Sequence, residues 1–295
     1  MDRRITPFNG RVAHLSLKGQ VEAERFVEGD RAVVVWGTVD LFPSESRACA
    51  MDRQLLLGEA LRVLEYREGW AFVRACKDGY CGWTSARHVT TEFVPGATHR
   101  VSARLTHGYL EPDFKVTWRF RELPMGAQLH VFDTTDRWAR VAVPAASDAV
   151  DRDRGYYERF VPASHLRALT DPEPDPVAVS ERLLGTPYLW GGNSSPGIDC
   201  SGLVQMGCTL CGIPCPGDSD MQFRELGETL PPGTPPQRGD LMFWKGHVAW
   251  VADPDTLLHA NVHHMAVAYE PINDAIDRIR AQGDGEVTRH ARVMP

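Results

Sequence analysis

The hydrophobic pattern from residue 31 to about residue 169 is that of short strands. Apolar stretches rich in β-branched and aromatic residues are separated by Gly, Asp and Pro turns at short intervals, which is typical of β-rich domains. The clearest of these stretches cover residues 32–36, 61–64 and 70–74. The preceding segment, residues 1–30, is polar and mixed, and we treat it as an N-terminal extension with a short helix expected over 20–28.

The β-rich region repeats the same spacing of anchor residues in its two halves. Self-similarity at a fixed period indicates repeated structural units, here of roughly 65 residues each. The second copy carries an Ala- and Asp-rich insertion. The repeat predicts two small β barrels, over 31–96 and 97–170. The matched anchors are Gly58 and Trp70 against Gly126 and Trp138, twelve residues apart, and Tyr80 and His88 against Tyr157 and His165, eight residues apart.

The pattern changes after a segment with proline at every second position, residues 171–176. Each proline removes a backbone donor and biases the preceding residue toward extended geometry, so this segment is predicted to be a stiff linker. Helices followed by strands then predict an α+β domain over 177–295. The helical periodicity covers 176–184 and 200–211, and the strand-like stretches cover 241–244, 247–252 and 257–261.

Composition and charge narrow the classes of function. The 295 residues carry a net charge of −7, with an isoelectric point of about 5.9. Neither nucleic acid nor an anionic membrane surface is expected as a partner, because both require a basic face. The apolar runs are far shorter than the ~20 residues that span a bilayer. Seven cysteines and no apolar stretch behind the first charged residues argue against a secreted disulfide framework, so a reducing, cytoplasmic setting is expected.

Cys200 joins a loop rich in Gly, Ser and Pro to the helical stretch 200–211. The unpaired N–H groups at a helix N-terminus favour a thiolate and can hold the oxyanion of a tetrahedral intermediate. A nucleophilic cysteine also needs a general base and a group that orients the base. His247 and His259 are the candidates, because they lie on neighbouring predicted strands that would bring their rings side by side.

Four segments, 188–192, 199–204, 246–248 and 259–260, resemble the NlpC/P60 family of cell-wall cysteine peptidases. The tandem β units resemble the bacterial SH3 domains that often precede such a domain. The whole architecture resembles the γ-D-glutamyl-L-diamino-acid endopeptidases that process murein peptides. This resemblance implies a papain-like α+β catalytic domain preceded by two SH3-like β barrels. It implies Cys200 as nucleophile, His247 as base and His259 as the orienting third residue, with no metal or organic cofactor.

The resemblance also implies a substrate and the residues that bind it. The expected substrate is a small free murein peptide, L-Ala-γ-D-Glu-diamino acid. Its free α-ammonium needs carboxylate and hydroxyl partners in a closed cleft. A peptide still attached to the glycan strand has no free amine there, so intact wall would be rejected. Recycling of such fragments suits a cytoplasmic enzyme. The implied binding residues are Tyr188 near the oxyanion, Ser201 beside the nucleophile, Asp218 and Ser219 at the substrate's amino end, and Tyr80 and Asp52 from the first barrel, with Glu45 as the second acidic candidate.

Two other classes of function stay open. An amidase or acyltransferase would use the same Cys-His-His core on a different acyl group. A non-enzymatic scaffold would bind peptides through its SH3-like units and a metal through its cysteines. The spacing of Cys208, Cys211 and Cys215 invites zinc or an iron–sulfur cluster, although the first two lie on an apolar helical face. The preferred diamino acid, Lys or meso-diaminopimelate, and the oligomeric state do not follow from the sequence.

Overall fold

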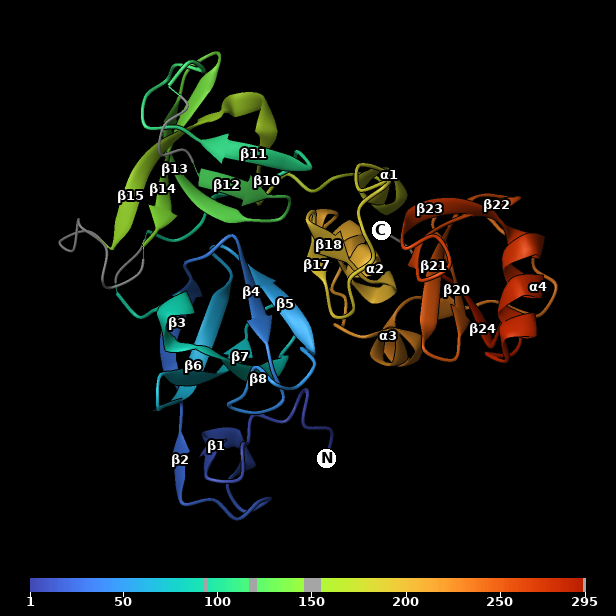
Figure 1. Ribbon diagram of the computed structural model, residues 1–295, viewed down its shortest axis with the longest axis horizontal. Coiled ribbons are helices and arrows are strands. Elements are labelled where there is room, and N and C mark those ends of the chain that lie inside the picture. The colour runs from blue at the N-terminus through green and yellow to red at the C-terminus, as the bar shows by residue number, and fades with distance from the viewer. Residues whose placement is uncertain (93–94, 117–120, 146–154, 294–295) are drawn as a thin grey trace. The chain divides into compact units, whose positions relative to one another are not determined.

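The computed structural model describes residues 1–92, 95–116, 121–145 and 155–293 (Figure 1). The chain forms two compact units, Met1–Asp171 and Pro172–Pro295, which are described separately. Residues 146–154, which hold most of the insertion expected in the second repeat, lie outside the described residues. Among the helices that are described, none combines the length and the apolar character needed to cross a membrane.

The two repeats fold into barrels with the same strand order. Each has a five-stranded sheet, β8-β7-β6-β3-β9 in the first and β15-β14-β13-β10-β16 in the second, and a two-stranded ribbon, β4-β5 or β11-β12. The predicted repeat is therefore confirmed strand by strand. The bounds are β3 Asp30–Val34, β4 Thr38–Leu41, β5 Arg53–Leu56, β6 Ala60–Arg67, β7 Trp70–Ala75, β8 Cys81–Ser85 and β9 Val89–Thr90, then β10 His99–Val101, β11 Leu105–Gly108, β12 Arg121–Pro124, β13 Gln128–Thr134, β14 Trp138–Pro144, β15 Tyr156–Pro162 and β16 Leu166–Ala168.

The anchors His88 and His165 occupy equivalent places in the two barrels. Each ends a single-turn 3-10 helix, Ala86–His88 or Ala163–His165, just before the last strand of its sheet. Their Nδ1 atoms lie 3.3 Å from the Thr84 hydroxyl and 2.7 Å from the Thr106 hydroxyl, respectively. The two threonines lie on strands that are not equivalent, β8 and β11, so the shared spacing reflects the shared 3-10 turn before the last strand.

The two barrels contact each other through their backbones at Gly58. The N–H of Gln128 donates to the carbonyl of Leu57 at 2.8 Å, and Leu57 itself belongs to the hydrophobic core of the second barrel. Gly58 has φ +79°, and a Cβ there would lie 2.0 Å from the carbonyl oxygen of Gln128. Only glycine allows both this conformation and this approach.

The N-terminal extension is part of the first barrel, and the helix expected over 20–28 is wrong. Strand β1 (Val12–His14) pairs in parallel with β2 (Arg25–Val27), with a 3-10 turn at Leu15–Leu17 between them. Val12 packs in the core beside Leu64 and Trp83. Residues 20–28 lack a continuous apolar face, so strand pairing and the burial of Val12 decide the local structure.

The second unit has a six-stranded sheet in the order β19-β24-β20-β21-β22-β23. The three predicted strands are confirmed as β20, β21 and β22, whereas β23, β24 and α4 were not predicted. Helix α1 ends three residues earlier than expected, in a turn that closes on Arg182. The bounds are α1 Pro176–Glu181, β17 Asn193–Ser194, β18 Gly197–Ile198, α2 Cys200–Leu210, α3 Ser219–Glu225, β19 Glu228–Thr229, β20 Asp240–Trp244, β21 His247–Asp253, β22 Thr256–Asn261, β23 Ala266–Pro271, α4 Ile272–Gln282 and β24 Arg289–Arg292.

Helices cover this sheet on both sides, with α2 and α4 on opposite sides in Figure 1. Helix α4 buries Ile272, Ala275 and Ile279 in a cluster with residues of β20, β21 and β22. Helix α1 crosses α2 so closely that a Cβ on Gly207 would lie 2.6 Å from the carbonyl oxygen of Pro176. This packing fixes α2, whose first residue is Cys200, against β21 and β22.

Candidate active site

Asp199 and the loop before it fix the start of α2. The Asp199 carboxylate accepts hydrogen bonds from the N–H of Gly202 at 2.6 Å and the hydroxyl of Ser201 at 2.8 Å. Its second oxygen accepts from the N–H of Gly191 at 2.9 Å. Asp199 is therefore an N-cap that also ties the preceding loop to the helix. As a result Cys200 occupies the first helical position, as the sequence predicts.

The thiol of Cys200 is buried. Burial, together with the negative charge of Asp199, raises its pKa to about 12, although the backbone N–H groups of Val248, Ser201 and Cys200 itself favour the anion. Desolvation therefore outweighs the helix N-terminus in the free protein, and Cys200 is a thiol there. The contact with Val248 places Cys200 beside the first residues of β21. A base must remove the thiol proton as the sulfur attacks.

His247 and His259 come together as the sequence predicts. The two residues lie on β21 and β22, neighbouring antiparallel strands in which Trp250 pairs with Leu258. His247 Nε2 lies 2.9 Å from His259 Nδ1. Burial, with the charges of His259 and Arg278, lowers the pKa of His247 to about 3. Both rings are thus neutral near pH 7, and a neutral imidazole can accept a proton.

Two further residues, which the sequence did not predict, complete the polar contacts of the histidines. Glu270, on β23, accepts from His259 Nε2 at 2.9 Å. Arg278, on α4, donates to both carboxylate oxygens of Glu270 at 2.7 and 2.8 Å. Glu270 and Arg278 lie on a strand and a helix that were not predicted, and their neighbours in the sequence form no recognisable motif. They reach His259 only through the strand register and the position of α4.

Tyr188 lies close to the nucleophile, as the resemblance implies. It forms a β-bridge with Ile198 and donates its backbone N–H to the carbonyl of Met265 at 2.9 Å. Burial, followed by the charges of Cys200 and Asp199, raises the pKa of the Tyr188 phenol. Its hydroxyl therefore stays protonated over the working range of pH and can donate a hydrogen bond.

Asp218 and Ser219 form the start of the short helix α3, where Asp218 is the N-cap residue. Gln222 of the same helix donates to the carbonyl of Ser201 at 2.9 Å, so α3 is fixed to the first turn of α2. Ser201 is buried and its hydroxyl donates to Asp199. The structure thus brings Ser201 and the start of α3 to the same end of α2.

Comparison with known proteins agrees with this geometry. Residues 185–281 match the NlpC/P60 family, and residues 41–89 match a family described as the bacterial dipeptidyl-peptidase Sh3 domain. Residues 185–281 are therefore identified as an NlpC/P60 domain. The second match lies in the first barrel, so the SH3-like character of that repeat is confirmed, as is the α+β fold of the catalytic domain.

Relatives and solved structures extend this agreement over most of the chain. Dipeptidyl-peptidase 6 of Lysinibacillus sphaericus is 26% identical over 247 residues, which cover 78% of this chain and 88% of the relative. The γ-D-glutamyl-L-lysine dipeptidyl-peptidase of Bacillus cereus is 26% identical over 253 residues, covering 77% and 72%. The crystal structure of an NlpC/P60 family protein from Bacillus cereus ATCC 10987 has a TM-score of 0.73 at 20% identity, covering 90% of this chain and 100% of that one.

The protein is a cysteine peptidase. The alternative of a non-enzymatic scaffold is therefore wrong. Among the residues that the structure describes, no three His, Cys, Asp or Glu side chains are arranged to hold a metal ion. All seven cysteines are free thiols, and the thiols of Cys208 and Cys215 contact each other.

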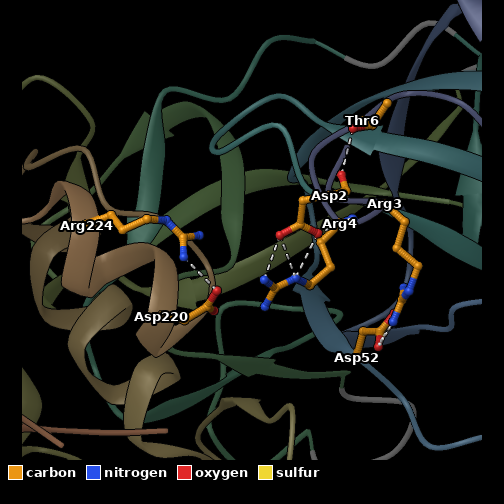
Figure 2. Close-up of polar contacts among 7 residues, drawn as sticks. All are labelled: Asp2, Arg3, Arg4, Thr6, Asp52, Asp220 and Arg224. Carbon is orange, nitrogen blue, oxygen red and sulfur yellow. Dashed lines mark hydrogen bonds and ion pairs between the residues drawn. The ribbon is translucent and has the colours of Figure 1, made fainter. Parts of the chain in front are cut away.

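The remaining predicted residues lie in the other compact unit. Arg3 donates to both oxygens of Asp52 at 2.6 and 2.8 Å (Figure 2). Glu45 accepts from Arg11 at 2.6 Å. Both acidic candidates for an ammonium partner are thus paired with an arginine. Tyr80 is buried, and the substrate-binding roles of Tyr80 and Asp52 stay predictions.

Proposed function

We propose that this peptidase hydrolyses the bond between γ-D-Glu and the diamino acid in free murein peptides with an unblocked N-terminal L-Ala. The observation that carries the proposal is a cysteine at the first position of α2, beside the strand that starts with His247. The names of the two relatives support it: one includes γ-D-glutamyl-L-lysine, and both include dipeptidyl-peptidase. Cleavage after γ-D-Glu in a free peptide releases the dipeptide L-Ala-D-Glu.

The reaction follows from the protonation states of the pair. Cys200 is a thiol and His247 a neutral imidazole in the free protein. As the sulfur attacks the γ-carbonyl carbon, His247 accepts the thiol proton, a carbon–sulfur bond forms, and the carbonyl electron pair moves to oxygen. When the intermediate collapses, the carbon–nitrogen bond breaks and His247 protonates the leaving amine. Water, deprotonated by His247, then attacks the thioester and regenerates the thiol.

The oxyanion of each tetrahedral intermediate needs donors that are fixed before the reaction. The N–H groups of Cys200 and Ser201 at the start of α2 already interact with the thiol. The protonated Tyr188 hydroxyl is the third candidate donor. We assign these groups to stabilising the oxyanion, which makes the rigid capping of α2 by Asp199 part of the catalytic arrangement.

Recognition of the free amine is assigned to the start of α3. A buried ammonium needs a carboxylate partner. We assign this role to Asp218, with the Ser219 hydroxyl, because Gln222 ties the helix that they begin to Ser201, the residue after the nucleophile. A substrate that must present a free L-Ala amine is a released peptide rather than the intact wall, and this suits the recycling of wall fragments.

The test is a panel of synthetic peptides assayed by liquid chromatography and mass spectrometry. We expect L-Ala-γ-D-Glu-L-Lys, L-Ala-γ-D-Glu-meso-diaminopimelate or both to yield L-Ala-D-Glu, with a kcat/KM far above that of the N-acetylated forms. The α-linked L-Ala-L-Glu-L-Lys controls for the γ-linkage. Cys200→Ala should abolish turnover.

Other results would lead to a different function. If the wild-type enzyme leaves both free γ-linked peptides intact, the proposal fails; release of an acyl group from another amide would then favour an amidase or acyltransferase. Equal kcat/KM for free and N-acetylated peptides would contradict the role of the amine, and with it the assignment of Asp218.

A further inference from the structure

A row of four polar side chains runs through the interior of the catalytic domain behind the base. His247 Nε2 lies 2.9 Å from His259 Nδ1, and His259 Nε2 lies 2.9 Å from Glu270 Oε2. Arg278 contacts both oxygens of Glu270. His259 and Glu270 are buried. An acid and a base in this setting are costly unless every polar atom has a partner, so the row is an arrangement that the fold maintains.

The strand register explains how the row forms. His259 pairs with Ala268 on β23, and Glu270 lies two residues further along the same strand. Residues two apart on a strand share a face, and such diagonal neighbours on adjacent strands come within contact distance. Helix α4 begins directly after β23 and brings Arg278 back over the same face. Each link therefore depends on backbone pairing rather than on a flexible loop.

The row determines which ring nitrogens carry protons. Burial alone opposes ionisation of Glu270, but hydrogen bonds from Arg278 and His259 hold its pKa well below the usual range. An ionised carboxylate only accepts, so His259 Nε2 must carry the hydrogen. A neutral His259 then has a bare Nδ1, which accepts from His247 Nε2. That leaves the lone pair of His247 on Nδ1, as the nitrogen that can take the thiol proton.

We infer that Glu270 is a positioning residue for catalysis, which selects the proton-accepting tautomer of His247 through His259. This inference rests on the proposed role of His247 as the base. Glu270 also supplies negative charge behind the two rings, which favours the imidazolium that forms when His247 is protonated. Arg278 keeps the carboxylate ionised and oriented.

The charges around the His247 and His259 rings identify Glu270 as the group that favours their protonation. Besides the Cys200 thiol, whose proton His247 is proposed to accept, three charged or titratable groups among the described residues face the rings: Glu270 from β23, Arg278 from α4 and His264 from the turn after β22. Arg278 and His264 disfavour protonation of the rings, and Glu270 opposes them. Of these three groups, Glu270 alone is an anion.

The same sheet offers a matched control. Asp240 on β20 is also fully buried, accepts from His290 Nε2 at 2.9 Å, and is held by Arg292 at 2.7 and 2.9 Å. This set contains the same three kinds of group, a carboxylate, an imidazole and a guanidinium, without a contact to His247. Loss of its charge should therefore lower stability without changing the base.

The experiment compares Glu270→Gln with Asp240→Asn in the full-length protein. The amide offers one oxygen to three donors, so its oxygen should stay with Arg278 and its NH2 should face His259, which favours the opposite tautomer in both rings. We expect kcat on the γ-linked peptide to fall roughly 10- to 100-fold in Glu270→Gln with little change in KM. Asp240→Asn should keep its kcat within about twofold of wild type.

The decisive readout is the tautomer itself, measured by 15N NMR of histidine-labelled protein at neutral pH, which needs no substrate. Wild type should show the hydrogen on Nε2 of both His247 and His259, and Glu270→Gln should shift it toward Nδ1. A wild-type His259 with its hydrogen on Nδ1 overturns the inference, even if the variant does not fold. So does a Glu270→Gln enzyme whose kcat matches that of Asp240→Asn. By contrast, a failure of the wild type to cut the peptide would count against the proposed function alone.

Discussion

Asp199 shows how much of the active site depends on one carboxylate. It accepts from the N–H of Gly202, the hydroxyl of Ser201 and the N–H of Gly191, and it directly precedes the nucleophile. Burial raises the pKa of Cys200, and the charge of Asp199 raises it further. Asp199 thus fixes the start of the helix but makes the adjacent thiol less acidic. The sulfur must therefore be activated by His247.

Replacing Asp199 should therefore affect both stability and catalysis. In Asp199→Ala the helix loses its cap and buried donors lose their acceptor, which we expect to lower the free energy of unfolding by roughly 2–4 kcal/mol. The kcat should fall as well, because Cys200 and the adjacent N–H groups lose their fixed position. Denaturant unfolding and peptide hydrolysis measure the two effects.

Asp175→Ala is the matched control for this prediction. Asp175 caps α1 through the N–H groups of Val177 and Ala178, away from the nucleophile. It should lower stability while leaving kcat nearly unchanged. An Asp199→Ala protein that is as stable and as active as wild type would refute the role assigned to this carboxylate.

At the residue scale, the sequence revealed those residues that belong to local motifs. Cys200 and His247 have distinctive neighbours, and Tyr188 begins the segment 188–192 that carries part of the resemblance. Glu270 and Arg278 could not be found in this way, because their contact with His259 depends on strand register and on the return of α4. The protonation state of the Cys200 thiol could not be predicted either, since desolvation is a property of the packed structure.

At the scale of elements, the repeated barrels were predicted from spacing because turns and aromatic anchors recur at fixed intervals. The elements that were missed or wrong lack such a signal. The expected helix over 20–28 is replaced by β2, which gains its stability from pairing with β1 and from the core that Val12 enters. Local pattern cannot reveal a strand whose partner lies elsewhere in the chain.

The contact between the barrels predicts a specific effect at Gly58. Gly58→Ala adds a Cβ 2.0 Å from the Gln128 carbonyl oxygen at φ +79°, so the barrels must move apart or the backbone must distort. Gly69→Ala provides the control, because Gly69 has φ +82° and nothing within 4 Å of the added Cβ. Both variants experience the backbone strain of roughly 1–2 kcal/mol. Only Gly58→Ala adds the clash.

Differential scanning calorimetry would separate the two effects. We expect Gly58→Ala to lower the melting temperature of the N-terminal unit well below that of Gly69→Ala, with peptidase chemistry at Cys200 retained where the catalytic unit stays folded. Equal shifts for the two variants would show that the close approach of the barrels contributes nothing to stability.

At the scale of the whole molecule, the change in pattern at residues 171–176 coincides with the division of the chain into two compact units at Asp171 and Pro172. The α+β class of the catalytic domain could be predicted because helices precede strands in its sequence. Substrate choice could not be derived in the same way, since it depends on how side chains far apart in the chain meet one peptide. The proposed substrate rests on the resemblance, on the names of the relatives and on the need of a free ammonium for a carboxylate partner.

The most direct test of Cys200 as the nucleophile is covalent labelling with L-Ala-γ-D-Glu diazomethyl ketone, which places the proposed acyl group against the thiol. We predict that it inactivates the wild-type enzyme and that mass spectrometric mapping finds the label on Cys200 and on none of the other six cysteines. The N-acetylated reagent should react far more slowly, and Cys200→Ala should stay unlabelled. Labelling of a different cysteine, or full activity after treatment, would contradict the assignment of Cys200 as a nucleophile toward γ-D-glutamyl substrates.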